Sequence, residues 1–159
     1  MSDKKELKLT PSIQKFILNW SRIASVWGMN RTVAQIHALL LVSPEPLTAD
    51  QIRAVLQSAR SNISVSLRLL ENLGLIESVH VMGERKKHFE ALKDIKQMFK
   101  RIMGVRKKKE VETTRKSLHE VANLTGKDPL DRKMNAQLNE INGVFSKLDA
   151  LYEKLIDDI

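Results

Sequence analysis

The segment from residue 58 to residue 76 constrains the fold of this chain more than any other stretch. Its apolar side chains recur at steps of four and three, the spacing of one face of an α-helix: Ile63, Leu67 and Leu70. Ser58 has the side chain of a helix N-cap, and Gly74 lies where a helix needs a left-handed residue just past its end. The sequence therefore predicts an amphipathic helix that begins near Ser58, ends at Gly74 and passes directly into an extended segment.

The outer face of this predicted helix carries short polar and basic side chains. The residues on it are Arg60, Ser61, Asn62, Ser64, Ser66 and Arg68, with Val65 the one apolar residue nearby. Most surface helices carry long Glu and Lys side chains, whereas this one has a single acidic residue, near its end. Short hydrogen-bond donors and arginines suit a helix that enters the DNA major groove and touches base edges. We therefore expect these seven residues to form a recognition helix, with Arg60 and Asn62 reading bases.

The chain before this segment predicts further helices with identifiable start signals. Thr10-Pro11 opens a helix that ends at Gly28, and Asn30 caps a second one over residues 31–42. Thr48 and Gln51 form a capping box, so a third helix is expected over residues 49–57. A short helix and a polar-faced helix joined by a tight turn are the sequence form of a helix-turn-helix.

Two strand-like runs follow Gly74, at residues 75–82 and 87–92, on either side of a turn that contains Gly83. This pattern predicts a β-hairpin, and a hairpin directly after a recognition helix is a wing. The basic residues expected to hold DNA from this wing are Arg85, Lys86 and Lys87. A basic loop at this place can reach phosphates or a minor groove.

The C-terminal part predicts long helices. Asp94 restarts a helix that weakens into a basic stretch, and Asp128-Pro129 opens the last one. The last helix carries a heptad seam expected to mediate dimerisation: Met134, Leu138, Ile141, Phe145, Leu148, Tyr152 and Leu155. A second row, Val144 and Leu151, widens its apolar face. The helix must pair with the helix of residues 94–122, with the N-terminal helix or with a second subunit, and a homodimer is the economical solution because palindromic DNA sites need two recognition helices.

These elements predict a mainly α fold in two parts. Residues 1–92 are expected to form a winged helix-turn-helix domain with an N-terminal helix, and residues 93–159 a helical dimerisation region. The net charge of +8 favours an anionic partner, here double-stranded DNA. Four basic residues at 106–109 are either a solvated helix face or a second contact with phosphate.

Several function classes lack support in the sequence. There is no cysteine, the four histidines share no helix face or paired spacing, and no phosphate loop, catalytic triad or carboxylate pair is present. We therefore expect no enzyme activity, no metal and no cofactor. Neither a signal peptide nor a membrane span is recognisable, so a cytoplasmic protein without a membrane partner is expected.

Residues 15–95 resemble the GbsR branch of the MarR-like winged-helix transcriptional regulators. The likeness is carried by Trp27-Gly28, Pro44-Glu45-Pro46-Leu47-Thr48, Ser61-Asn62-x-Ser64, Leu67-Arg68, Leu73-Gly74-Leu75, Gly83-Glu84-Arg85-Lys86 and Phe89-Glu90-Ala91. Position 89 is Phe where this family favours Tyr. The resemblance implies a dimeric DNA-binding repressor or activator, with repression favoured, and a small-molecule effector related to choline or glycine betaine. Such an effector needs an aromatic cage, whereas every aromatic residue here also fits an apolar stripe or strand.

A second interpretation is a winged-helix module that docks on a partner protein through its basic surface and its last helix, because fold alone does not decide function. A protein-docking face would carry an aromatic or leucine anchor. The outer face of residues 60–68 carries serines, Asn62 and arginines instead, which favours DNA.

Overall fold

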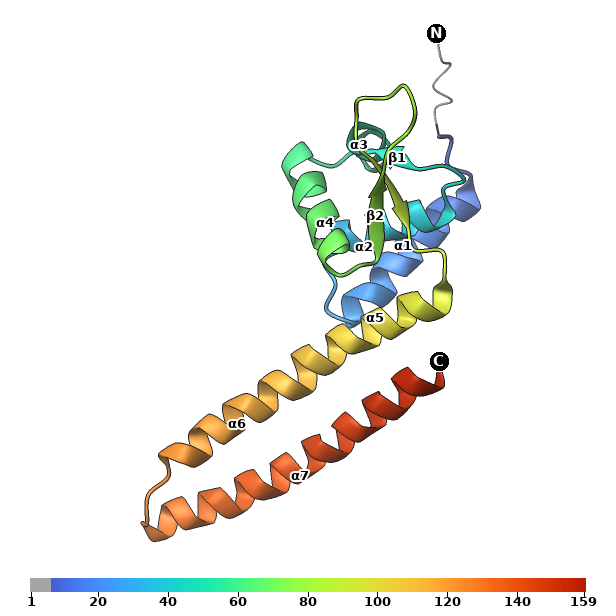
Figure 1. Ribbon diagram of the computed structural model, residues 1–159. Helices are drawn as coiled ribbons and strands as arrows, with labels where there is room; N and C mark the ends of the chain where they lie inside the picture. The colour runs from blue at the N-terminus through green and yellow to red at the C-terminus, as the bar shows by residue number, and fades with distance from the viewer. Residues whose placement is uncertain (1–6) are drawn as a thin grey trace. The chain divides into compact units, whose positions relative to one another are not determined.

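The computed structural model describes residues 7–159, and these form two compact units divided between Met98 and Phe99. The fold is mainly α with one small sheet, as expected, and the winged helix-turn-helix lies in the first unit (Figure 1). The second unit is a helical hairpin. Among the described residues, no helix has the length and apolar character needed to cross a membrane.

The first unit is built around α2 (Arg31–Val42), whose side chains are buried on almost every side. The helices α1 (Pro11–Val26) and α4 (Arg60–Asn72) both pack on it. Both predicted N-caps are confirmed: Thr10 Oγ1 accepts a hydrogen bond from the Ile13 amide, and Asn30 Oδ1 accepts one from the Thr32 amide at 2.8 Å. A central helix with so few polar side chains could not be stable in water, so α2 is the core on which the other elements assemble.

The turn between α3 (Ala49–Leu56) and α4 differs from the prediction at one residue. The capping box at the start of α3 is confirmed, with both hydrogen bonds between Thr48 and Gln51 formed. However, the N-cap of α4 is Ala59, which makes no side-chain capping bond, and the prediction of Ser58 is wrong. Gln57 adopts a left-handed conformation (φ 49°, ψ 38°), so Ser58 is used to complete the turn and lies one residue too early to cap α4.

The end of α4 redirects the chain into the sheet. Gly74 has φ 68°, as its predicted role required. The Gly74 amide donates to the Glu71 carbonyl at 2.9 Å and the Leu75 amide to the Leu70 carbonyl at 3.0 Å. These are the two hydrogen bonds of a Schellman motif, and both Leu70 and Leu75 are buried. The start of the wing is therefore fixed to the end of α4.

The sheet contains the predicted hairpin and one strand that was not predicted. The hairpin strands are β2 (Ile76–Val79) and β3 (His88–Ala91), which are antiparallel with Val79 opposite His88. The additional strand, β1 (Leu47–Thr48), pairs with the other side of β3, so the strand order is β1-β3-β2. Two residues are too few to show an alternating pattern, which is why the sequence did not reveal β1.

The second unit begins within α5 (Ile95–Lys107), which continues through the π-helical turn η1 (Lys108–Glu112) into α6 (Thr113–Leu124). The basic stretch therefore lies inside one continuous helix. The last helix, α7 (Pro129–Asp158), opens with Asp128 as N-cap and packs on α6 and η1. Of the pairings expected for the last helix, the structure shows the one with the preceding helix of the same chain.

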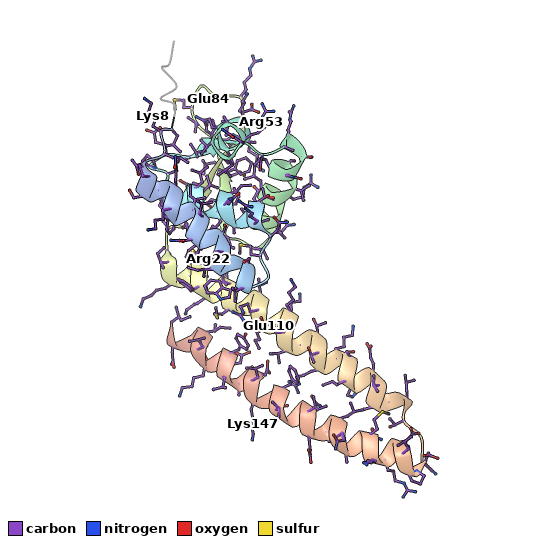
Figure 2. All side chains as sticks on the ribbon, turned by 180° about the vertical axis from the view of Figure 1, so that it is seen from behind. Lys8, Arg22, Arg53, Glu84, Glu110 and Lys147 are labelled. Atoms are coloured by element: carbon purple, nitrogen blue, oxygen red, sulfur yellow. The ribbon has the colours of Figure 1, made fainter. Side chains whose placement is uncertain are left out.

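A polar layer links α5 and η1 to α7. The Lys107 ammonium is ion-paired with Glu153 and lies 3.6 Å from an Asp149 carboxylate oxygen. The Tyr152 hydroxyl donates a hydrogen bond to Glu110 at 2.7 Å, which lowers the pKa of the Glu110 carboxyl. In Figure 2, Glu110 and Lys147 mark the two helices of this hairpin. The layer fixes the register of α7 against the helix before it.

Candidate nucleic-acid interface

A groove of about 450 Å³ lies between α3, α4 and the wing. Basic side chains from all three elements line it, namely Arg53, Arg60, Arg68, Lys86 and Lys87, together with the acidic residues Asp50 and Glu71. Arg53 on α3 and Glu84 in the wing loop lie at the same end of the first unit in Figure 2. The helix-turn-helix and the wing thus form one concave, predominantly basic surface.

Most side chains expected on the outer face of α4 are exposed. These are Arg60, Ser61, Asn62, Ser64, Val65 and Arg68. Ser66 is the exception: only 5% of it is exposed, so its predicted place on the outer face is wrong. Ser66 lies three residues after Ile63 and four before Leu70, which puts it on the buried face of the helix. Because serine is polar, it was not counted among the apolar residues whose spacing marks the buried face.

The wing lysines are held by carboxylates of the helix-turn-helix. Lys86 forms an ion pair with Asp50 at 2.5 Å, and this contact holds the pKa of the Asp50 carboxyl below its usual value. Lys87 forms an ion pair with Glu71 at 3.0 Å and lies over the Phe89 ring. These pairs are largely exposed, so each contributes little to stability. Their effect is to hold the second arm of the wing, the residues that lead into β3, against α3 and α4.

Arg85 is the wing cation without such a partner. It is exposed, and no ion pair to it is found in the described part of the chain. Of the three predicted wing residues, Arg85 is therefore the one whose charge is fully available to a ligand. The charges of Lys86 and Lys87 are partly neutralised by Asp50 and Glu71.

Sequence reasoning missed Arg53 and Asp50. Both are on α3, three residues apart, so they share one face of the helix. The capping box at Thr48 fixes where α3 begins, and this start would have placed both side chains beside α4. Asp50 matters because it lies in the field of Arg53 and Arg60 as well as Lys86.

The heptad residues of α7 separate into two adjacent rows. Leu138, Phe145, Leu148 and Tyr152 are half-buried, on the side that faces α6 and η1. Met134, Ile141 and Leu155 remain 39%, 42% and 47% exposed. They form a second row with Leu130, Val144 and Leu151, all exposed as well. The hairpin therefore uses only half of the apolar face of α7.

The basic cluster at 106–109 is partly engaged inside the second unit. Arg106 forms an ion pair with Glu110 at 3.0 Å, and Lys107 pairs with carboxylates of α7. Lys108 and Lys109 are exposed. The ion pairs favour a structural role for the first two residues of the cluster.

The aromatic residues of α1 are engaged in packing. The Trp20 ring lies 5.9 Å from the rings of Phe16 and His37 and 6.4 Å from that of Trp27, measured between centroids. Tyr152 belongs to the polar layer of the second unit. These contacts favour core packing over an effector cage for these side chains. Among residues 7–159, no group of three or more potential metal ligands is found.

Together, the helix-turn-helix, the wing and the groove between them define a winged helix-turn-helix protein with a C-terminal helical hairpin. No family model matches the chain, and no curated protein matches it either. Among solved structures, the chain is similar to a protein described as a transcriptional regulator, with 17% identity over 93% of this chain and 97% of that one and a TM-score of 0.68. At this identity the likeness shows the fold.

Two further solved structures have lower TM-scores. One is a MarR family transcription regulator, with 18% identity, coverage of 94% of this chain and 88% of that one, and a TM-score of 0.43. The other is a complex of Staphylococcus aureus MepR with DNA, with 16% identity, coverage of 86% and 99%, and a TM-score of 0.40.

Proposed function

We propose that this chain is a sequence-specific transcriptional regulator that binds double-stranded DNA as a homodimer, at an inverted-repeat operator. The observation that carries this proposal is the exposed face of α4, which combines arginines with short polar side chains and opens on a basic groove shared with α3 and the wing. The surface complements a duplex in charge, and α4 offers side chains that can read base edges. Repression is the favoured direction, because a protein bound at an operator blocks access to it.

Within this proposal, α4 enters the major groove. Arg60 can donate two hydrogen bonds to a guanine, and Asn62 can pair with an adenine. Val65, which is 65% exposed, suits contact with a thymine methyl group. Ser61, Ser64 and Arg68 orient the helix on the backbone. Kinship with the GbsR branch of MarR-like regulators is part of the same proposal, supported by the motif residues of α4 and the wing.

The wing and α3 hold the phosphate backbone. Arg85 contributes an unpaired charge, and Arg53 adds a cation from α3. Lys86 and Lys87 add two further cations, for which phosphates must compete with the carboxylates of Asp50 and Glu71. Phosphate contacts position the protein without reading sequence, so their loss weakens binding to all DNA alike.

The second copy packs on the exposed row of α7. Ile141, Val144 and Leu151 follow the alternating spacing of a coiled-coil seam, and self-association of one helix is the simplest way to cover such a seam. The lysines that flank it, Lys133, Lys147 and Lys154, lie at positions beside the apolar row. A symmetric pair of chains presents two copies of α4, as a two-fold operator requires.

Selection of genomic fragments by the purified protein at near-physiological salt tests the proposal. We expect enrichment of an inverted repeat with half-sites about one helical turn apart, roughly 10 base pairs. Binding without any enriched motif would contradict sequence-specific regulation. The protein would then be assigned as an interaction module with a salt-sensitive basic surface.

Substitutions in α4 and the wing are expected to have different effects. Arg60→Ala or Asn62→Ala should cost about 1–3 kcal/mol on the selected operator and relax the preference at one base position. Lys86→Ala should weaken operator and unrelated DNA by a similar factor and reduce the salt dependence of binding. Fluorescence anisotropy at several salt concentrations measures both effects. Ser66→Ala is the matched control inside α4, because the buried Ser66 side chain cannot reach DNA. Equal losses across sequences for Arg60, Asn62 and Lys86 would contradict the assignment.

A further inference from the structure

The tip of the wing is a tight and well-defined turn. The Glu84 amide donates a hydrogen bond to the Val81 carbonyl at 3.0 Å, so Met82 and Gly83 are the central residues of a β-turn. Gly83 has φ +80°, the left-handed conformation that the second central residue of a type II turn requires. A side chain at this glycine would meet nothing within 4 Å. Its backbone conformation, and not a lack of space, therefore accounts for the glycine.

Met82 is the corner residue of this turn and is 100% exposed, while the neighbouring Val81 is 37% exposed. Figure 1 shows the loop extending beyond β2 and β3 on the side where α3 lies. Single exposed apolar residues are common and need no explanation alone. Here, however, the apolar side chain is a central residue of the turn that joins the hairpin strands, and no described part of the first unit covers it.

The second arm of the loop is anchored. Lys86 and Lys87 are ion-paired with Asp50 on α3 and Glu71 on α4. The Nδ1–H group of the buried His88 ring donates to the Lys86 carbonyl oxygen at 2.9 Å. These contacts hold residues 86–88 beside the helix-turn-helix. The turn at Met82 lies beyond them and is free to meet a ligand at the groove.

We infer that Met82 is an apolar wedge that enters the DNA minor groove next to the half-site read by α4 and partly unstacks one base step. This inference rests on the proposed function. The minor groove is about 6 Å wide, so it admits the corner of a tight turn but no helix. Proteins that kink DNA from the minor groove insert apolar side chains, methionine among them, between bases. Arg85, three residues further on and unpaired, is placed to neutralise the flanking phosphate.

The energy cost of unstacking indicates which base step Met82 favours. Unstacking costs least at pyrimidine–purine steps, which are the most easily kinked. The wedge therefore favours such a step at a fixed distance from the bases read by α4. It also bends the duplex toward the major groove, by an angle within the roughly 20–90° range of minor-groove wedges. Met82 thus adds sequence preference at positions that make no hydrogen bond with the protein.

Base stacking in the complex tests this inference. The probe is the operator fragment recovered by selection, with 2-aminopurine placed in turn at each position flanking a half-site and a fluorophore pair at its ends. With the wild-type protein we expect a rise in 2-aminopurine fluorescence at one step and a shortened end-to-end distance. Met82→Ala should abolish the rise, reduce the bend and weaken binding about tenfold, whereas Met82→Leu should retain all three properties. Because Met82 is fully exposed, both variants should melt at the wild-type temperature.

The control separates this inference from the proposed function. Arg68→Ala on α4 should weaken binding while leaving the fluorescence rise intact at saturating protein. If the wild-type protein binds its operator and Met82→Ala gives the same fluorescence and the same bend, the wedge is wrong and the proposed function stands. If no operator is recovered, both are overturned.

Discussion

Replacing Ile141 and Leu151 of α7 by lysine is expected to turn the proposed dimer into a monomer and to lower operator affinity by about 10²–10⁴-fold. Both side chains are exposed in the single chain, at 42% and 63%, so the hairpin of α6 and α7 does not depend on them. In a symmetric dimer, each lysine would place a charge in an apolar contact and near its own copy. In a dimer, binding of one α4 raises the effective concentration of the other α4 at its half-site. A monomer loses this gain in affinity.

Analytical ultracentrifugation and operator binding measure this effect together. Asn139→Lys is the control, because it introduces a lysine at an exposed position of α7 outside the apolar row. The control should remain dimeric, and both proteins should keep the helix content of the wild type. A double variant that still sediments as a dimer would contradict the assignment of this row to the interface.

The heptad row shows where sequence periodicity stops being informative. The pattern predicted one seam from Met134 to Leu155, whereas the structure divides the same residues between two neighbouring faces. Periodicity reports which side chains avoid water, and it does not distinguish a partner helix in the same chain from one in another. The polar layer of Lys107, Asp149 and Glu153 makes the difference, because it pairs one face of α7 with α5. Charges separated by more than forty residues cannot be paired from sequence alone.

Local signals were more reliable. The caps at Thr10, Asn30 and Thr48 and the left-handed Gly74 were predicted because each rests on a bond between neighbours in the chain. Ala59 was missed because a helix can begin without a side-chain cap, and Ser58 offered a better-looking signal one residue earlier. Most of the expected face of α4 is exposed for the same local reason: helical period fixes it. Ser66 and Arg53 were missed although local signals could have placed them, namely the helical period of α4 and the capping box of α3. The ion pairs of the wing depend on which elements meet, and that information is tertiary.

The core of the first unit contains a histidine whose burial makes stability depend on pH. His37 is 0% exposed. Its Nδ1 atom accepts a hydrogen bond from Trp20 Nε1–H at 3.3 Å, so the neutral ring carries its proton on Nε2. Protonation would place a second donor against the Trp20 N–H group and a charge in the core. Burial accordingly lowers the pKa of His37 to about 4 from its ordinary 6.5.

Stability should therefore fall by about 3 kcal/mol as the pH decreases from about 6.5 to about 4, because in that range the unfolded chain binds a proton at His37 and the folded chain does not. Above this range the contribution is constant.

Urea unfolding at pH 4.5, 5.5 and 7 measures the effect. His37→Gln, which keeps an acceptor for Trp20, should lose this part of the pH dependence. His80→Gln is the control, since it removes an exposed histidine and leaves the core intact. Carboxylates contribute equally to all three proteins, so parallel losses in wild type and His37→Gln would show that the buried ring is not the titrating group. A flatter profile for His37→Gln alone would show that the Trp20–His37 contact at the centre of α1 and α2 is held only by the neutral imidazole.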